Sequence, residues 1–319
     1  MIRPSIMAAV ALALTTGTAL AQFPERAITL VVPYGAGSTT DTLARVIGDK
    51  AAEILSQPII VENRAGAGGI IGTEFVAGAE ADGYTIIFAA NQTHATNVSL
   101  YPDLSYDPIE DFTPIARLVM QPQVLVVNPE VEANTVEELA KLAQTTDGGL
   151  AFASTGIGTG AHLSGELFGL STGSELVHVP YNGSEAITAV LTGTAQFMFY
   201  PYLPLKGHID NGVLRLLAGT SPERVEWLPD TPTMIELGYP DFVMSSWFAV
   251  YGPAGLDAET TKILSDAFLM ALADEKVAET LSAGGSISIA GGPAELADFT
   301  KSEIQRAADI VERSGVTIE

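Results

Sequence analysis

The chain has 319 residues, with 38 acidic residues against 15 basic ones, and its formal net charge is −23. Such acidity argues against partners that are themselves anionic, namely nucleic acid and anionic membrane surfaces. The sequence contains no cysteine, which excludes disulfides and thiol chemistry, and its length is enough for two lobes of ordinary domain size.

The first 21 residues have the pattern of a signal peptide. Arg3 gives a positively charged start, a mostly apolar run extends from about residue 6 to residue 20, and Ala19-Leu20-Ala21 is an A-x-A cleavage site. The alternative, a membrane anchor, needs roughly 20 apolar residues, and this run is shorter. We expect residues 1–21 to be removed by cleavage after Ala21 and the mature chain to enter the periplasm.

Short β-rich runs then alternate with helical ones. Strands are expected at 28–32, 59–63 and 85–89, with a helix over 41–55 and another that runs through 74–77. Strands joined by helical crossovers predict a mostly parallel sheet with right-handed βαβ units. This first group predicts an α/β lobe.

The same rhythm begins again after a break. A strand at 124–127 precedes a helix whose start, with Asn134 and Glu137, resembles a capping box. Four more strands are expected at 150–153, 176–179, 196–199 and 215–218. The second group therefore predicts a second α/β lobe.

Two apolar runs, Pro114–Val119 and Trp247–Tyr251, flank the second lobe and are expected to cross between the lobes as a hinge. Two amphipathic helices, 258–273 and 294–313, are expected to return to lobe 1. A two-lobed molecule with a cleft that closes by hinge motion follows from this arrangement. The expected domains are 22–120 with 248–319 for lobe 1, and 121–247 for lobe 2.

Three loops rich in Gly, Ser and Thr run directly into helical segments: Pro33–Asp41, Ser154–His162 and Val179–Ser184. The first N–H groups of a helix have no partner within it and carry the positive end of its dipole. Small residues let a ligand approach these N–H groups closely. Together the loops predict a receptor for a carboxylate or similar anion, and they do not by themselves indicate catalysis.

Other kinds of site are disfavoured. The run Gly66–Gly72 lacks the last glycine of the dinucleotide motif, since Ile71 stands there, and tight helix–strand packing is expected instead. The four histidines do not have metal-ligand spacing, and the sequence has no G-x-S-x-G motif. We expect no enzyme activity, no cofactor and no metal; a catalytic triad assembled only in space stays open as an alternative.

Four polar residues have individual expectations. His178 lies in a strand pattern and is expected in the core or on a lobe surface, whereas His94 and His162 are expected in loops near the cleft. Asp41 opens a helix and is expected to cap it or to fix the loop, because its carboxylate would repel an anionic ligand.

Several segments, in the same order along the chain, resemble the Bug family, the periplasmic receptors of tripartite tricarboxylate transporters. They are Val32–Asp41, Asn63–Gly72, Asp82–Thr85, His178–Gly183, Leu228–Thr233 and Glu303–Val316. The resemblance implies a type II periplasmic binding-protein fold, an α/β fold whose lobes enclose a cleft for a small carboxylate. It also implies membrane permease subunits as partners, and we expect a monomer.

The resemblance further implies the ligand-binding residues, with some contacts made through ordered water. Tyr200 is added because tyrosines at strand ends near the glycine loops make the cleft partly aromatic. The expected set is Tyr34, Gly35, Ala36, Gly37, Ser38, Thr39, Asn91, Thr93, His94, Ser154, Gly158, Thr159, His162, Tyr181, Gly183 and Tyr200.

Two departures from the family pattern bear on the ligand. Gly35-Ala36-Gly37 stands where family members commonly have Pro-Gly-Gly, and Tyr200-Pro201 stands where they often have an aspartate. An acidic residue there would suit a ligand amine, so an amino-acid ligand is disfavoured. We expect a solute-binding receptor for a di- or tricarboxylate or an aromatic acid; the alternatives are a sensor for a signalling partner or an exported hydrolase.

Overall fold

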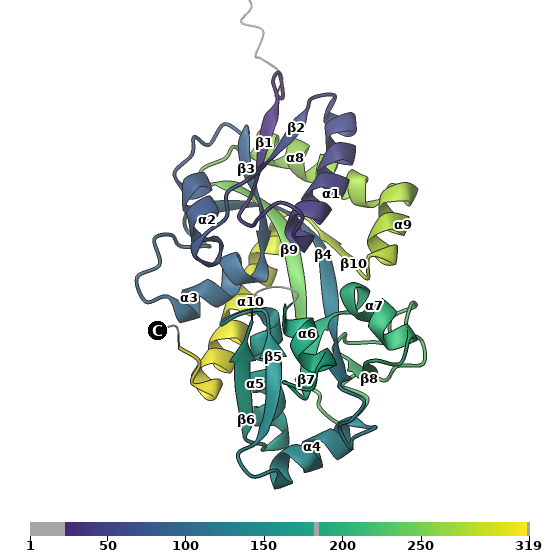
Figure 1. The fold of residues 1–319 in the computed structure, drawn as a ribbon. Coiled ribbons are helices and arrows are strands. Elements are labelled where there is room, and N and C mark those ends of the chain that lie inside the picture. Colours follow the sequence, from purple (N-terminus) through teal and green to yellow (C-terminus); the bar gives the residue numbers. More distant parts are fainter. Residues whose placement is uncertain (1–22, 182–184, 318–319) are drawn as a thin grey trace, which may run out of the picture.

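The structure, a computed structural model, describes residues 23–181 and 185–317, so the predicted signal peptide and Gly183 lie outside the described residues. Lobe 1 contains three parallel strands, with β1 (Ile28–Val32) between β2 (Ile59–Asn63) and β3 (Thr85–Ala90). These are the strands that the first group of apolar runs predicts, and β1 and β2 have the predicted bounds. Figure 1 shows them at the top of the molecule.

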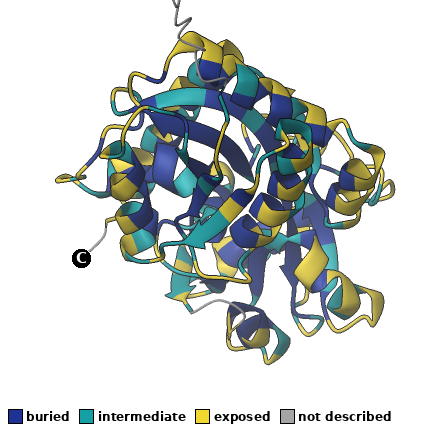
Figure 2. Ribbon diagram, turned by 90° about the horizontal axis from the view of Figure 1, so that it is seen from above, coloured by how far each residue is buried: buried dark blue, intermediate teal, exposed yellow. Residues whose placement is uncertain are grey.

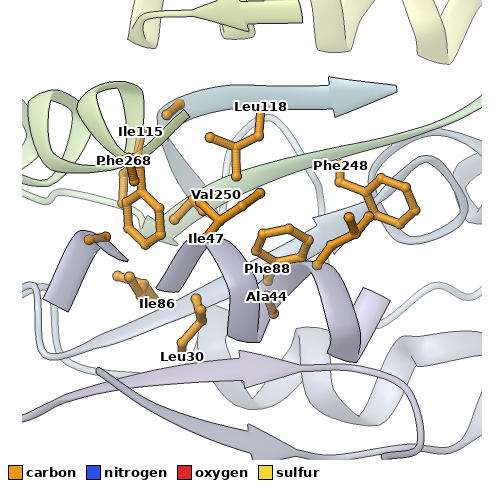
Figure 3. Close-up of a cluster of buried hydrophobic side chains, with 14 of the residues drawn as sticks. Leu30, Ala44, Ile47, Ile86, Phe88, Ile115, Leu118, Phe248, Val250 and Phe268 are labelled. Carbon is orange, nitrogen blue, oxygen red and sulfur yellow. The ribbon is translucent and has the colours of Figure 1, made fainter. Parts of the chain in front are cut away.

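The crossover helices of lobe 1 are α1 (Thr39–Leu55) and α2 (Ile70–Ala77). On α1, Leu43, Ile47 and Ala51 are buried, which is the spacing of one helix face. That face packs with strand residues such as Leu30 and Phe88 and with Phe268 of α8 (Ala258–Leu272) in the largest core cluster (Figure 3). Viewed from above, the strands are dark blue and the outer sides of the helices are yellow (Figure 2).

Lobe 2 repeats the arrangement in the lower half of Figure 1. There β5 (Leu150–Ser154) pairs in parallel with β6 (Leu176–Pro180) and with β7 (Phe197–Pro201). The remaining elements of this lobe are α4 (Val136–Thr145), α5 (Gly160–Thr172), α6 (Glu185–Leu191), α7 (Tyr202–Asp210) and β8 (Arg215–Gly219).

The start of α4 differs by one residue from the prediction. Thr135, not Asn134, is the N-cap: its hydroxyl accepts a hydrogen bond from the Glu138 N–H at 3.1 Å. The Glu138 carboxylate in turn accepts the Asn134 N–H at 2.6 Å. Both Asn and Thr can cap a helix and Glu137 and Glu138 are adjacent, so spacing alone did not identify the correct pair.

Two long strands connect the lobes. The first half of β4 (Phe112–Val127) pairs with β9 (Ser245–Pro253) and with β10 (Ile287–Gly291), whereas its last residues pair with β7 and β8. At 16 residues β4 is about three times the usual strand length. The sheet order is β2-β1-β3-β9-β4-β7-β5-β6, and the two runs predicted as the hinge lie within β4 and β9.

The C-terminal helices are α8, α9 (Glu275–Ala283) and α10 (Pro293–Ser314). We expect 258–273 and 294–313 on lobe 1, and α8 packs there, but α10 contacts both lobes. Its last turns place Ile310 and Val311 in the core cluster of lobe 2, and Figure 1 shows α10 descending beside α5. At 22 residues the helix is long enough, about 33 Å, to extend past the hinge. Within the described residues, no helix combines the length and apolar character needed to cross a bilayer.

Three short elements lie between β2 and β4 in addition to α2 and β3. They are η1 (Ala67–Gly69), η2 (Gln92–Thr96) and α3 (Asn97–Leu100).

The glycine run Gly66–Gly72, which leads into α2, has the packing role that we expect for it. A Cβ on Gly72 would lie 2.7 Å from the Arg64 carbonyl oxygen and 2.9 Å from the Pro33 Cα. Only glycine therefore lets α2 approach the end of β1 this closely.

Gly165 of α5 gives a stability prediction for lobe 2. A Cβ there would lie 2.1 Å from the buried Phe152 ring, so Gly165→Ala is expected to lower the free energy of unfolding by about 1 to 3 kcal/mol. Gly207→Ala on α7 is the control, because a Cβ at Gly207 meets nothing within 4 Å and alanine favours the helix by about 1 kcal/mol. Urea unfolding measures both variants, and equal effects at the two sites would contradict the packing argument.

Candidate functional site

A cavity of about 420 Å³ lies between the two lobes; we call it the cleft cavity. The loop before α1 and the turn after β3 line it from lobe 1, while the start of α5 and the end of β7 line it from lobe 2. Its walls carry hydroxyl, amide and aromatic groups, and among the described residues no carboxylate, lysine, arginine or histidine lines it. The lining residues are Tyr34, Gly37, Ser38, Thr39, Thr40, Ala90, Asn91, Gln92, Gln121, Gln123, Thr155, Thr159, Gly160, Ala161, Tyr200, Pro201, Ser246 and Phe248.

Helix α1 begins at the wall of the cleft cavity. Ser38 is its N-cap, and the Ser38 hydroxyl accepts a hydrogen bond from the Asp41 N–H at 3.2 Å. Among the described residues, the N–H groups of Thr39 and Thr40 meet no hydrogen-bond acceptor. The lobe 1 wall therefore offers two backbone donors at the positive end of a 17-residue helix.

Helix α5 begins at the opposite wall in the same manner. Thr159 is its N-cap: its hydroxyl accepts the His162 N–H at 3.4 Å and donates to the Gly156 carbonyl at 2.8 Å. The N–H groups of Gly160 and Ala161 likewise meet no acceptor in the part of the chain that the structure describes. Two helix starts from different lobes thus face one uncharged cavity, an arrangement suited to anions.

Asp41 fixes the loop before α1, as the sequence predicts for it. Its carboxylate accepts hydrogen bonds from the Gly37 N–H at 2.8 Å and from the Asn63 amide at 2.9 Å, and Arg45 forms an ion pair with it at 2.9 Å. Arg45 first, with the bonds from Gly37 and Asn63, lowers the pKa of Asp41 from 3.8 to about 2. The carboxylate is buried beneath the loop, and the Gly37 N–H is directed to it.

His162 and His178 support the lobe 2 loop. The Gly158 N–H donates to His162 Nδ1 at 3.0 Å, and the two imidazole rings stack with centroids 3.7 Å apart. Ser154 Oγ lies 2.6 Å from His178 Nε2. Burial, and then the neighbouring His162, lowers the pKa of His178 to about 4. His162 lies in the first turn of α5, not in a loop as we expect, because the helix begins two residues before it.

His94 also differs from its expected place in a loop near the cleft. It lies in the π-helical turn η2, fully buried, with its ring stacked on Tyr251 at a centroid distance of 4.1 Å and packed edge-on against Phe112 at 4.7 Å. Burial lowers its pKa to about 3. His94 is therefore a neutral core residue of lobe 1, and Thr93 is equally buried beside it.

The predicted site residues divide into three groups. Those that line the cleft cavity are Tyr34, Gly37, Ser38, Thr39, Asn91, Thr159 and Tyr200. Gly183 lies outside the described residues. The cavity lining does not include the others: Gly35, Ala36, Thr93, His94, Ser154, Gly158, His162 and Tyr181.

Sequence reasoning missed the floor of the cavity, which the hinge strands supply. Gln121 and Gln123 of β4 and Ser246 of β9 line it there. Both glutamines are less than a tenth exposed, and the side-chain Oε1 of Gln123 accepts a hydrogen bond from the Ser164 hydroxyl at 2.7 Å. The two glutamines, which stand next to the apolar run 124–127, were the feature of the sequence that could have indicated a polar cavity floor.

Comparison with known proteins finds the same family over most of the chain. The family described as "Tripartite tricarboxylate transporter family receptor" matches residues 43–316. Protein BugT of Bordetella pertussis is 37% identical over 299 residues, which are 93% of this chain and 92% of BugT.

Two similar solved structures hold carboxylates. Rpa4515 of R. palustris with adipate has a TM-score of 0.82 and 31% identity, covering 93% of this chain and all of that one. MatC from Rhodopseudomonas palustris with bound malate has a TM-score of 0.78 and 32% identity, covering 91% of this chain and all of that one. These likenesses confirm the two-lobed periplasmic binding-protein fold predicted from the sequence.

Proposed function

The chain belongs to the family of tripartite tricarboxylate transporter receptors, and on that premise we propose that its cleft captures a small dicarboxylate. Proteins of this family are solute-binding receptors and not enzymes. The observation that carries the proposal is the pair of helix starts, because each offers two N–H donors to one cavity. One carboxylate group at each start uses all four donors. The adipate and malate held by relatives are both dicarboxylates.

Ligand contact is assigned to the residues that line the cleft cavity on both sides. Ser38, Asn91 and Tyr200 supply side-chain polar groups around the backbone donors. The Ser38 hydroxyl uses only its oxygen in capping, so its proton remains for a carboxylate, whereas the Thr159 hydroxyl already donates to Gly156. The buried Ser154 and His162 hold the lobe 2 loop in shape.

Binding to both lobes is what couples the ligand to transport. A ligand that touches only one lobe has the same affinity for open and closed forms and shifts nothing. One that bridges Thr39 and Gly160 favours the closed form, which the membrane permease then recognises. Removal of the leader after Ala21 releases the receptor, as a monomer, into the periplasm.

Calorimetry with matched acids tests this function. Succinate, malate, glutarate and adipate are each compared with the monocarboxylate of equal carbon number, and adipate also with neutral adipamide. At least one dicarboxylate is expected to bind about tenfold or more tighter than its monoacid, since the second carboxylate adds charge-assisted hydrogen bonds worth about 1.5 kcal/mol or more. The ligand is recovered chemically unchanged. If no dicarboxylate exceeds its monoacid, or adipamide binds as well as adipate, the proposal fails.

A further inference from the structure

Two further cavities adjoin each other away from the cleft. The rear cavity, about 600 Å³, is lined by Met120 and Ser245, whereas their neighbours Gln121 and Ser246 line the cleft cavity. Since side chains alternate along a strand, the rear cavity lies on the opposite face of β4 and β9. The side cavity, about 530 Å³, shares Met120, Pro222 and Ser288 with it.

Two arginines, Arg117 and Arg306, line the rear cavity. The Glu295 carboxylate is a neighbour of Arg117 around Gly291 but lies beyond ion-pair distance. Arg306 is paired with Glu303 at 2.7 Å. Arg117 donates from Nε to the Ile289 carbonyl at 2.7 Å, and its guanidinium lies 5.0 Å from the Phe299 ring centroid. Among the described residues, no carboxylate lies within 4.0 Å of Arg117, and its terminal nitrogens meet no acceptor.

The side cavity supplies the apolar half of a site. Its apolar walls are Val225 and Trp227 from lobe 2 and Leu272 and Leu281 from lobe 1, and Met120 lines both this cavity and the rear cavity. The charged residues Glu223, Arg224 and Glu226 also line it. A ligand that spans both cavities therefore needs an anionic head and a hydrocarbon body. We propose that the rear and side cavities form a second binding site, for an amphipathic monocarboxylate whose head pairs with Arg117.

Ser288 is the position at which to test this site, because it is exposed and lines both cavities. Ser288→Glu places a carboxylate beside the expected head group, and Ser288→Gln is its uncharged match. The probe is decanoate below its micelle concentration, measured by calorimetry on the full mature chain. Saturable binding with one site is expected, weakened about tenfold or more in Ser288→Glu relative to Ser288→Gln.

Further measurements distinguish binding at this second site from binding in the cleft cavity and from non-specific adsorption. Arg117→Gln is expected to weaken decanoate binding similarly, while Lys301→Gln, which removes an exposed cation of α10 that lines neither cavity, leaves it unchanged. Thr39→Asp, which alters only the cleft cavity, also leaves it unchanged. Decanol, which lacks the charge, binds more weakly than decanoate. Equal affinities in the two Ser288 variants, equal binding of decanol, or no saturable binding would each overturn the proposal.

Discussion

Thr39→Asp is expected to lower the affinity for a dicarboxylate about 100-fold while the protein stays folded. Thr39 is exposed at the first position of α1 and lines the cleft cavity. A carboxylate about 5 Å from that of the ligand costs about 3 kcal/mol at an effective dielectric constant of 20, which is a factor of about 100 in the dissociation constant. The new charge lies at a helix start, where an acidic side chain is favourable by about 0.3 to 1 kcal/mol.

Thr39→Asn is the matched control, since Asn has the size of Asp and no charge. We expect it to weaken binding less than about tenfold, the effect of changing one neutral polar contact. Calorimetry gives the affinities of both variants, and urea unfolding verifies that both are folded. An equal loss in the two variants would mean that the lobe 1 wall acts by shape and not by attracting an anion.

Much of this site was predictable because its donors belong to the backbone. The loops Pro33–Asp41 and Ser154–His162 are rich in small residues and are followed by helical patterns, and each helix begins two residues before the end of its loop. Local composition indicates such a helix start because capping and chain flexibility are properties of neighbouring residues. The role of Asp41 follows for the same reason, as its partners Gly37 and Arg45 are four residues away.

Features that depend on distant contacts were not predictable. The floor of the cleft cavity requires Gln121 of β4 to lie beside Ser246 of β9, residues far apart in the chain. His94 is a polar residue with no local sign that Phe112 and Tyr251 will enclose it. Of the elements not predicted, β10 pairs, within the part of the chain that the structure describes, with β4 alone, and its short ISIAG run alternates too briefly to stand out.

Asp41→Asn is expected to lower the free energy of unfolding by about 2 kcal/mol at pH 7. The substitution removes the ion pair with Arg45 and weakens the hydrogen bonds from Gly37 and Asn63, while asparagine keeps the shape of the side chain. The folded-state pKa of about 2 against an ordinary 3.8 corresponds to about 2 kcal/mol of stabilisation by the ionised form. Because the loop that these bonds hold carries the lobe 1 wall, ligand affinity is expected to fall as well.

The pH dependence separates the charge of Asp41 from its shape. A carboxyl group whose pKa is lower in the folded state stabilises the protein fully above the unfolded-state pKa, near 3.8, and loses that contribution as the pH falls through about 2. The difference in unfolding free energy between the natural protein and Asp41→Asn is therefore expected to be constant from pH 7 to about pH 5 and to shrink between pH 4 and pH 2. Urea unfolding at a series of pH values measures this difference directly. A difference that persists unchanged at pH 2.5 would show that asparagine disrupts the loop through its amide geometry, and that the charge of Asp41 contributes little to holding it.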